Sequence, residues 1–503
     1  MKRKVFDLPA SDFGWQVARD IFFLVCLLAM SFYAVYFASE DASRVFFLSL
    51  LIFFVLSKKD YFWFAFFFII AQGPGHLFAD LSAASSHRLP FYTFLAGMSF
   101  TPIDLFVLVA LAKSLTLGKK ATLRLRKPLF LLLLYIAFTL IVTSTLYGTD
   151  IDVVAWNIRW LFYYSVILSF YYLMNGKKDV YLFAILVFPV VLFIFFTQVH
   201  FLVTGNEFVN LFSPGYRSLT LIVLTGSIRP MVGGILILFL CYFFSILLLV
   251  DKEHVLPRTH IYLIAAVALL SVFVSATRQW FVVFSFMFLG YALLIRKKIL
   301  STLGILASIL IVVGALTYFS VIPSDTLLHG SWLRIQEVLS LTRGDISAIG
   351  TAQNRFVNQL PILLGVIKRN PVIGYGFSNT TMVYYDNDLG FVNTILIFGI
   401  IGFLLHVNLF VHIFMLLLKS AKKIGAGNTC KGPLRVLALA WAGLLLIYLT
   451  TQDFFAFYFN KVFFVSVLIV FTEYFARKAL NEELYGKAGK VLNGTISGER
   501  WRI

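Results

Sequence analysis

Aspartates and arginines placed beside long apolar runs are the residues of this chain best suited to do chemistry. Asp388 stands just before an apolar run that begins at residue 390, and Asp453 lies in the turn TTQDFFAFYFNK between two other apolar runs. A carboxylate near the membrane, with its pKa perturbed by partial burial, can act as a general base toward a hydroxyl group. Each aspartate also has a simpler interpretation, because an aspartate before a helix is often only its N-cap and one in a turn is often only solvated.

Three arginines are candidates for binding an anion. Arg278 lies in VSATRQW between two apolar arms of sixteen residues, 261–276 and 280–295. An arm of that length spans ~24 Å as a helix, less than the ~30 Å hydrocarbon core, so we expect Arg278 to lie below the outer surface. The same arithmetic applies to Arg159, whose following apolar run has fifteen residues, whereas Arg229 lies at the interface itself.

An arginine inside a bilayer is costly unless it faces a watery cavity or an anion. Its planar guanidinium can hold a phosphate through two parallel hydrogen bonds. We therefore interpret Arg159, Arg229 and Arg278 as the lining of a cavity for a strongly anionic, membrane-tethered ligand such as a lipid-linked pyrophosphate. Snorkelling to the surface remains the alternative for Arg159 and Arg278, and anchoring to lipid headgroups remains the alternative for Arg229.

These residue types fit glycosyl transfer from a pyrophosphate carrier, which needs a base at the acceptor hydroxyl and positive charge at the departing pyrophosphate. The arginines would take the place of a divalent ion, so we expect no metal and no cofactor. Tyr375 offers a ring that can stack on sugars, with an interfacial aromatic belt as the alternative. The sequence has no P-loop, Rossmann, HExxH or CxxC pattern and only three cysteines, so nucleotide-driven transport, metal hydrolysis and redox chemistry lack support.

Long apolar helices must position these residues. The 503-residue chain is 60% hydrophobic and 13% charged, with a mean hydropathy of +0.89, whereas roughly a quarter of the residues in soluble domains are charged. We predict an all-α integral membrane protein, a single polytopic domain over 1–503, with about fourteen spans of ~20 residues or somewhat fewer. The expected spans are 15–38, 44–57, 61–78, 102–117, 128–146, 157–174, 179–203, 229–250, 260–277, 279–295, 299–320, 390–418, 435–451 and 461–476.

The basic residues predict the orientation of these spans. Lysine-rich segments fall on alternate loops, which the positive-inside rule assigns to the cytoplasm, so both termini, with a tail over 477–503, are expected there. The net charge of +18 therefore reflects topology rather than nucleic-acid binding. The outer face is rich in arginine and holds the largest connection, 321–389, which is long enough to form its own helices over 331–341 and 354–370.

Several short motifs together resemble the bacterial O-antigen polymerase and O-antigen ligase superfamily. The run RFVNQLPILLGVIKRNPVIGYGFSN, followed by NDLGFVNTILIFGIIGF, is similar to the C-terminal signature of that family. An arginine precedes an amphipathic helix, a Pro-x-x-Gly-x-Gly turn closes it, and a polar residue opens a helix containing Gly-x-x-Gly, which we expect to allow close helix packing. The SATRQW hairpin resembles the family's Ser-x-Ser-Arg element, and TPIDLF at 101–106 resembles another recurrent polar start of an early span. The corresponding residues here are Arg278, Arg355, Pro371, Gly374, Gly376, Asp388, Gly399 and Gly402.

The resemblance implies a GT-C type architecture and a metal-independent, inverting glycosyltransferase on the periplasmic side of the bacterial inner membrane. Its donor and acceptor would be polyprenyl-pyrophosphate-linked oligosaccharides, with membrane lipid and a chain-length regulator protein as further partners. The ligase branch has a His-Asn pair where this chain has Asp388 and Leu389, which favours the polymerase branch. A ligase that passes the glycan to a lipid A core or another acceptor remains an alternative. A lipid-linked oligosaccharide flippase is a further one, although the polar features gather on one face of the membrane.

Overall fold

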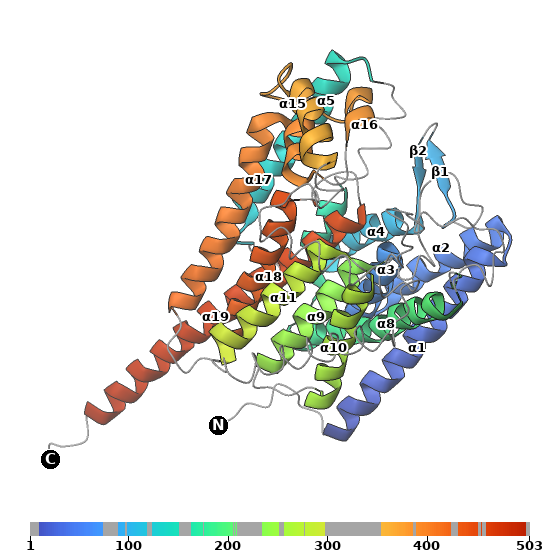
Figure 1. The fold of residues 1–503 in the computed structure, drawn as a ribbon. Coiled ribbons are helices and arrows are strands. Elements are labelled where there is room, and N and C mark those ends of the chain that lie inside the picture. Colours follow the sequence, from blue (N-terminus) through green and yellow to red (C-terminus); the bar gives the residue numbers. More distant parts are fainter. Residues whose placement is uncertain are drawn as a thin grey trace, which may run out of the picture.

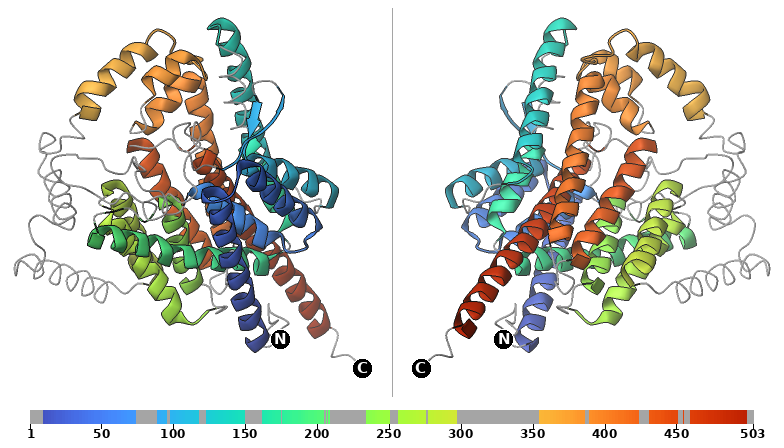
Figure 2. Two further views of the ribbon diagram at one scale, coloured as in Figure 1. Left: turned by 90° about the vertical axis from the view of Figure 1, so that its right-hand side faces the viewer. Right: turned by 90° about the vertical axis from the view of Figure 1, so that its left-hand side faces the viewer.

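In the computed structural model, the chain is a bundle of helices with one small β-hairpin (Figure 1). The start of α1 (Ala10–Tyr36) and the end of α19 (Phe459–Gly498) lie at the same end of the bundle, at the bottom of Figures 1 and 2. The hairpin and the short helices α15 and α16 lie toward the opposite end. The structure describes residues 10–73, 89–95, 98–117, 123–149, 162–174, 176–204, 206, 208, 234–250, 256–275, 277–296, 354–385, 389–423, 431–450, 454 and 459–498.

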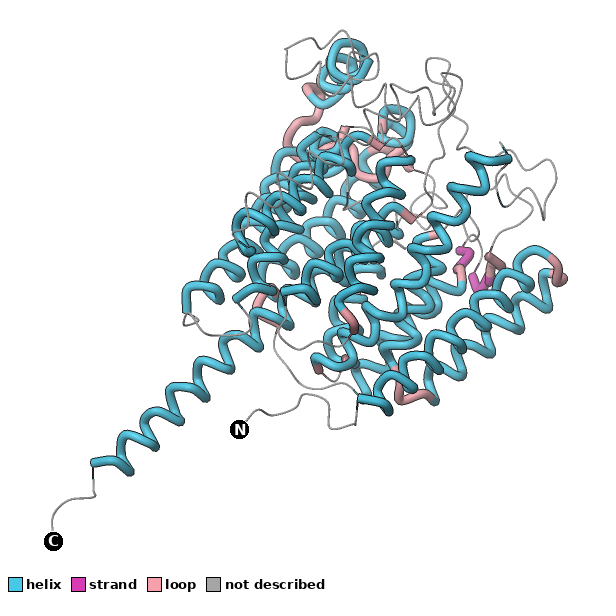
Figure 3. Tube along the Cα trace, turned by 60° about the horizontal axis from the view of Figure 1, so that its bottom comes forward, coloured by secondary structure: helices cyan, strands magenta, loops and turns pink. Residues whose placement is uncertain are grey.

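The first third of the chain pairs helices with the hairpin. Its elements are α1, α2 (Glu40–Leu56), α3 (Asp60–Gln72), β1 (Tyr92–Leu95), β2 (Met98–Phe100), α4 (Pro102–Leu117) and α5 (Arg126–Leu146). The strands are antiparallel, and they form the small magenta element in Figure 3. The start of α2 holds the hairpin, because Arg44 Nε donates to the Phe91 carbonyl at 2.9 Å and the Tyr92 hydroxyl donates to the Arg44 carbonyl at 2.7 Å.

Among the remaining residues that the structure describes, all regular structure is helical. Its elements are α7 (Val166–Leu173), α8 (Lys177–Thr204), α9 (Ile235–Val250), α10 (Arg258–Val274), α11 (Arg278–Gly290) with the π-helical extension η3 (Tyr291–Arg296), η4 (Asn354–Gln359), α15 (Leu360–Ile367), α16 (Asn379–Tyr384), α17 (Gly390–Lys423), α18 (Lys431–Thr450) and α19. Apart from the hairpin, the all-α prediction is confirmed for the described residues.

Five of the described helices are long and apolar enough to cross a membrane: Gly14–Tyr36, Arg126–Leu146, Lys178–Phe201, Gly390–Lys422 and Lys431–Thr450. Six shorter apolar helices accompany them. Large apolar side chains remain exposed on α1, α2 and α5, as on Phe22, Leu56 and Phe130, and contiguous exposed apolar surface is typical of a protein that faces lipid. The chain is therefore an α-helical membrane protein.

A described helix overlaps thirteen of the fourteen expected spans, but only five of the described helices are long and apolar enough to cross a membrane. The remaining span, 299–320, lies outside the described residues, as does the loop helix expected over 331–341. The loop helix expected over 354–370 is confirmed as η4 and α15. The expected tail begins inside α19, which continues past residue 477 to Gly498.

The centre of the bundle is formed by helices that are apolar on every side. Every residue of α3 from Asp60 to Gln72 except the half-buried Phe62 is buried, and so is every residue of α9 from Leu236 to Leu249. Aromatic rings fill the spaces between helices, with Phe67 stacked on Phe106 of α4 at 4.1 Å between ring centroids. A helix without a polar face is stable only where protein or lipid covers it all round, which is why α3 and α9 are central.

Buried ion pairs join the ends of neighbouring helices. Lys113 Nζ of α4 lies 2.7 Å from the Asp60 carboxylate of α3 and also donates to the carbonyls of Phe54 and Ser57 at the end of α2. In the same region, the buried Asp20 of α1 accepts from Lys59 Nζ at 2.7 Å and from the Tyr61 hydroxyl at 2.8 Å. Charge burial is costly unless it is paired and hydrogen-bonded, so these contacts fix how the helix ends meet.

The TPIDLF motif is a capping structure. Asp104 accepts from the backbone N–H of Thr101 at 2.7 Å, and the Thr101 hydroxyl accepts in return from the Asp104 N–H at 3.3 Å. This reciprocal pair is the capping box that starts α4. The second carboxylate oxygen of Asp104 accepts from the Tyr163 hydroxyl at 2.8 Å, which links the start of α4 to the segment before α7.

Candidate functional site at a broken helix

The C-terminal motif of the sequence folds into a single backbone unit in which a turn is inserted into a broken helix. Helix α17 is interrupted at Gly399, which has φ +65° and ψ −172°. The turn Pro371–Gly376 lies against the interruption. We call this unit, residues 371–376 with 396–401, the helix-break junction.

Backbone hydrogen bonds hold the helix-break junction together. In a continuous helix the N–H groups of residues 400 and 401 would donate to the carbonyls of residues 396 and 397. Here the Ile400 N–H donates to the Pro371 carbonyl at 2.8 Å and the Ile401 N–H to the Val372 carbonyl at 3.4 Å. In return, the Leu396 carbonyl accepts from the Tyr375 N–H at 2.8 Å and the Ile397 carbonyl from the Gly376 N–H at 2.7 Å. The turn therefore pairs every one of these four freed groups, as a break inside a membrane requires.

Glycine is needed at three positions of the junction because of conformation and close approach. Gly374, Gly376 and Gly399 all have positive φ, a region that other L-residues rarely adopt. A Cβ on Gly399 would lie 2.1 Å from the Val372 carbonyl oxygen, and one on Gly374 would lie 2.5 Å from the Gly399 nitrogen. The backbones at Gly374 and Gly399, 25 residues apart in the sequence, can therefore come into contact only because both residues are glycine.

The second glycine of Gly-x-x-Gly has a different role. A Cβ on Gly402 would lie 2.1 Å from the Phe398 Cβ of the same helix and 3.0 Å from the Tyr135 ring of α5. Gly402 therefore makes room both for Phe398 beside the break and for the predicted close approach of α5. Tyr135 also donates its hydroxyl to the Phe398 carbonyl at 2.9 Å, and Phe398 immediately precedes the break. For Gly399, by contrast, the structure shows a helix break in place of the expected helix–helix contact.

Polar side chains surround the turn at the C-terminal end of α5. The Asn370 amide donates to both the Tyr147 hydroxyl and the Gly374 carbonyl, and the Tyr147 and Tyr375 rings lie 5.4 Å apart. The pKa of the Tyr147 hydroxyl is raised, chiefly because the surrounding protein excludes water, with Tyr375 adding to the rise and the Asn370 hydrogen bond opposing it. Tyrosine is neutral at physiological pH in any case, and this shift moves the titration of the hydroxyl further from that range.

Tyr375 is an internal residue of this site. It is 8% exposed, and its hydroxyl donates to the Val366 carbonyl of α15 at 3.1 Å. Its ring therefore supports the turn, whereas Tyr147, which is 39% exposed, presents the accessible aromatic face. Arg355, the arginine of the motif, is half-buried in η4 at the far end of the same helix.

Other predicted site residues fall at the limits of the described chain. Arg278 is the first residue of α11, and the structure describes its backbone only. Asp388, Arg159, Arg229 and Asp453 lie outside the described residues. Their hypothetical roles stay predictions.

Described neighbours of these residues show which helix ends converge. Helix α18 packs against both α11 and α17, and the Tyr448 hydroxyl near its end donates to Thr394 Oγ1 of α17 at 2.8 Å. Trp280, two residues after Arg278, has its ring 6.4 Å from that of Phe454, the residue after Asp453. The starts of α11 and α17 and the end of α18 therefore belong to one region of the fold.

Sequence reasoning missed three residues of this site: Tyr135, Tyr147 and Asn370. The two tyrosines lie in or directly after an ordinary apolar helix, so nothing in their local sequence marks them. Asn370 directly precedes Pro371, a pairing that is typical of turns, and this was the one available signal.

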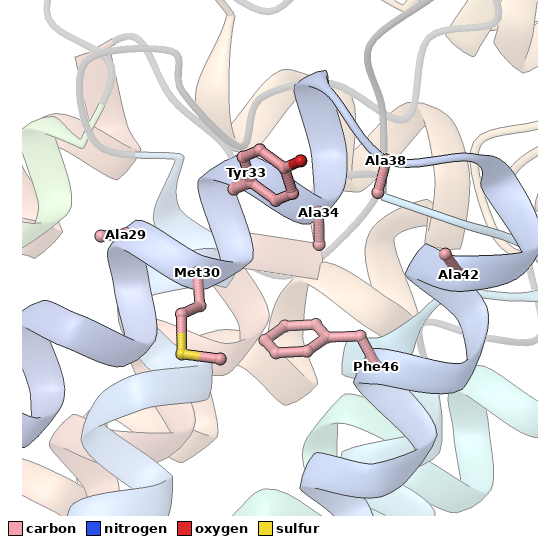
Figure 4. A pocket seen from close by; sticks show the side chains of 7 residues that line it. All are labelled: Ala29, Met30, Tyr33, Ala34, Ala38, Ala42 and Phe46. Atoms are coloured by element: carbon pink, nitrogen blue, oxygen red, sulfur yellow. The ribbon is translucent and has the colours of Figure 1, made fainter.

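A groove elsewhere on the bundle does not contribute to this site. It measures ≈ 470 Å³ and lies between α1 and α2. In Figure 4 Met30 and Phe46 face each other across it, and its other lining residues are Ala29, Tyr33, Ala34, Ala38 and Ala42. No charged group lines it, so it offers nothing to bind a pyrophosphate. Among the described residues, no group of three or more His, Cys, Asp or Glu side chains is placed to hold a metal ion.

No protein-family model matches the chain, and no curated protein matches it either.

Proposed function

We propose that this protein is a membrane glycosyltransferase of the O-antigen or exopolysaccharide polymerase type. It transfers a growing glycan from polyprenyl pyrophosphate to a lipid-linked repeat unit, on the periplasmic side of the bacterial inner membrane. The proposal includes about fourteen spans in a GT-C type arrangement, with both termini in the cytoplasm.

The helix-break junction is the observation that carries the proposal. The motif that resembles the superfamily is scattered over residues 355–402, and four of its members, Pro371, Gly374, Gly376 and Gly399, meet in one backbone unit. A chance match to a dispersed pattern would not be expected to place its glycines in contact with positive φ at three of them. The folded structure therefore supports the motif as a real unit and strengthens the resemblance on which the function rests.

The proposed reaction assigns roles to the predicted residues. Asp388, just before α17, accepts the proton of the acceptor hydroxyl as its oxygen attacks the anomeric carbon of the donor glycan. The bond from that carbon to the pyrophosphate oxygen breaks with inversion. Arg278, assisted by Arg159, Arg229 and Arg355, stabilises the charge on the departing polyprenyl pyrophosphate. Asp453 and the exposed ring of Tyr147, which the buried Tyr375 supports, bind the glycan.

The deciding experiment is incubation of the purified, reconstituted protein with one polyprenyl-pyrophosphate oligosaccharide and no other acceptor. A polymerase produces a ladder of longer lipid-linked chains, which gel electrophoresis or mass spectrometry resolves. Product that forms only after a lipid A core or another second acceptor is added would reject the polymerase in favour of the ligase.

The variant Arg278→Lys tests the role of the arginines. If the guanidinium holds the pyrophosphate with two hydrogen bonds, lysine keeps the charge but loses the geometry, so chain extension falls by at least about tenfold, a loss of ~1.4 kcal/mol of transition-state stabilisation. Arg435→Lys is the matched control, because Arg435 is exposed on α18 and lies outside the proposed site. Full activity in Arg278→Lys would contradict the assignment.

The broken helix also keeps the flippase alternative open. Discontinuous spanning helices are typical of transporters, where they line substrate sites near the membrane midplane. Movement of a fluorescent lipid-linked oligosaccharide across proteoliposomes, with no extension of its glycan, would establish transport in place of transfer.

A further inference from the structure

Helix α15 and the preceding π-helix η4 expose mainly apolar side chains on the side that faces away from the protein, with Asn358 of η4 as an exposed polar residue among them. The segment LPILLGVI of α15 contains no polar side chain. One face carries Leu363, Val366 and Ile367, which pack in a cluster with Leu389, Val392 and Leu396 around the first part of α17. The other face is uncovered.

The uncovered face is large for a segment outside the spanning helices. Ile362 is 60% exposed and Leu364 43%, and in η4 Val357 is 59% and Phe356 49% exposed. Val372, in the turn that follows, is 53% exposed. A helix that is hydrophobic all round needs an apolar environment on both sides, and here the protein supplies only one of them.

The charges of this segment identify the missing environment. Residues 354–370 contain no aspartate or glutamate, while Lys368 and Arg369 are exposed at the end of α15. An apolar face followed by cations is typical of a helix at the boundary of acyl chains and headgroups, where the cations meet lipid phosphates. In the left view of Figure 2 the gold helix slants outward from the top of the bundle, beside α17, which has the composition of a spanning helix.

We infer that η4–α15 is a membrane-interface helix that docks its uncovered face, Phe356, Val357, Ile362 and Leu364, into the outer boundary of the lipid bilayer. The phosphates of that leaflet bind Lys368 and Arg369. Because α15 packs on the first part of α17 and leads into the helix-break junction, the bilayer itself helps to hold the candidate site. The inference does not depend on the proposed reaction.

The test is the accessibility of spin labels in the full-length protein reconstituted into vesicles of phosphatidylethanolamine and phosphatidylglycerol. Single cysteines at 357, 362 and 364 are labelled in a background in which the native cysteines have been replaced. Each label is then exposed to molecular oxygen, which concentrates in lipid, and to a water-soluble nickel complex. Two positions of the same protein calibrate the scale: Ile141, 64% exposed on the spanning helix α5, and Thr93, exposed in the hairpin.

Labels at 362 and 364 should be accessible to oxygen, as at 141, and protected from nickel. Accessibility to nickel resembling that at 93 would overturn the inference, because it would place the face in water. Protection from both reagents would overturn it too, since another protein surface would then cover the helix. As a second measurement, Lys368→Gln with Arg369→Gln should move the labels away from the acyl chains, and should move them further in vesicles that contain phosphatidylglycerol than in vesicles of zwitterionic phospholipid alone. No movement in either kind of vesicle would contradict the role of the cations.

Discussion

Gly399 is the residue on which the geometry of the candidate site most depends. Its backbone conformation, φ +65° and ψ −172°, is essentially confined to glycine, and the Val372 carbonyl occupies the space that a side chain would need. A side chain at residue 399 would therefore be unfavourable for two reasons, the backbone torsion and the lack of space. Either reason alone would make a substitution destabilising.

The variant Gly399→Ala should destabilise the protein by about 2 kcal/mol or more, because the strained torsion alone costs on the order of 1–3 kcal/mol. Thermal unfolding in detergent measures the loss. Gly365→Ala is the control, since a Cβ there would meet nothing within 4 Å, and it should be neutral or slightly stabilising, as alanine is the better helix former. Equal stability of Gly399→Ala and Gly365→Ala would contradict the importance of the break.

A smaller loss of stability is expected when the hydrogen bond from Tyr135 to the helix-break junction is removed. Tyr135→Phe removes the hydroxyl that donates to the Phe398 carbonyl and should cost about 1 kcal/mol, the usual net value of one hydrogen bond. Unfolding of the variant is compared with that of Tyr33→Phe, whose ring is 62% exposed on α1. If the two substitutions had the same effect, the Tyr135 bond would contribute nothing to stability.

At the scale of elements, helix ends are joined by buried polar contacts within an otherwise apolar bundle. Lys113 joins α4 to both α2 and α3, and the side chains of Lys113 and Asp60 are 5% and 10% exposed. Apolar burial is non-directional, whereas a buried ion pair is satisfied only where its two charges meet. We therefore regard this pair as fixing the positions of α2, α3 and α4.

Lys113→Met should cost about 3–5 kcal/mol, because it leaves the Asp60 charge buried without its cation. Adding Asp60→Leu should recover a large part of the loss, which a double-mutant cycle of unfolding free energies measures. The control is Glu40→Gln in the exposed pair with Arg44, where the Glu40 side chain is 62% exposed and the expected cost is at most ~1 kcal/mol. A Lys113→Met cost no greater than the control would argue against a structural role for the buried pair.

At the scale of the whole molecule, the two ends of the bundle differ in what they present. The β-hairpin, α15, α16 and the helix-break junction lie toward one end, while the start of α1 and the end of α19 lie at the other (Figure 1). The basic segments predict that the second end faces the cytoplasm. The candidate site and the inferred interface helix would then share the outer face.

A membrane-impermeant maleimide tests this topology in intact cells. In a cysteine-free background, Thr93→Cys in the hairpin should react from outside, while Lys58→Cys and Lys422→Cys should react only after the membrane is permeabilised. All three positions are exposed, so failure to react reports the compartment. Reaction of the Thr93 and Lys58 positions under the same conditions would reject the predicted orientation.

The sequence determined the class of this protein and the approximate position of nearly every described helix. Hydrophobic composition and run length suffice for that, because a segment of ~20 apolar residues has few stable alternatives to a spanning helix. The sequence also pointed to the glycines of the C-terminal motif, although not to their physical purpose. A Gly-x-x-Gly pair in an apolar run reads equally well as close helix packing, so the break at Gly399 could not be predicted.

Only the tertiary structure decided how the motif works and what surrounds it. The turn at 371–376 supplies the hydrogen bonds that make the break possible, and such long-range pairing leaves no local signature. The same holds for Tyr135, Tyr147 and the pair of Lys113 with Asp60, each of which gains its role from a partner on another helix. The pattern of apolar residues along one helix shows which of its faces must be covered. It does not show which other segments cover them, and the break, the buried charges and the uncovered face of α15 all depend on those segments.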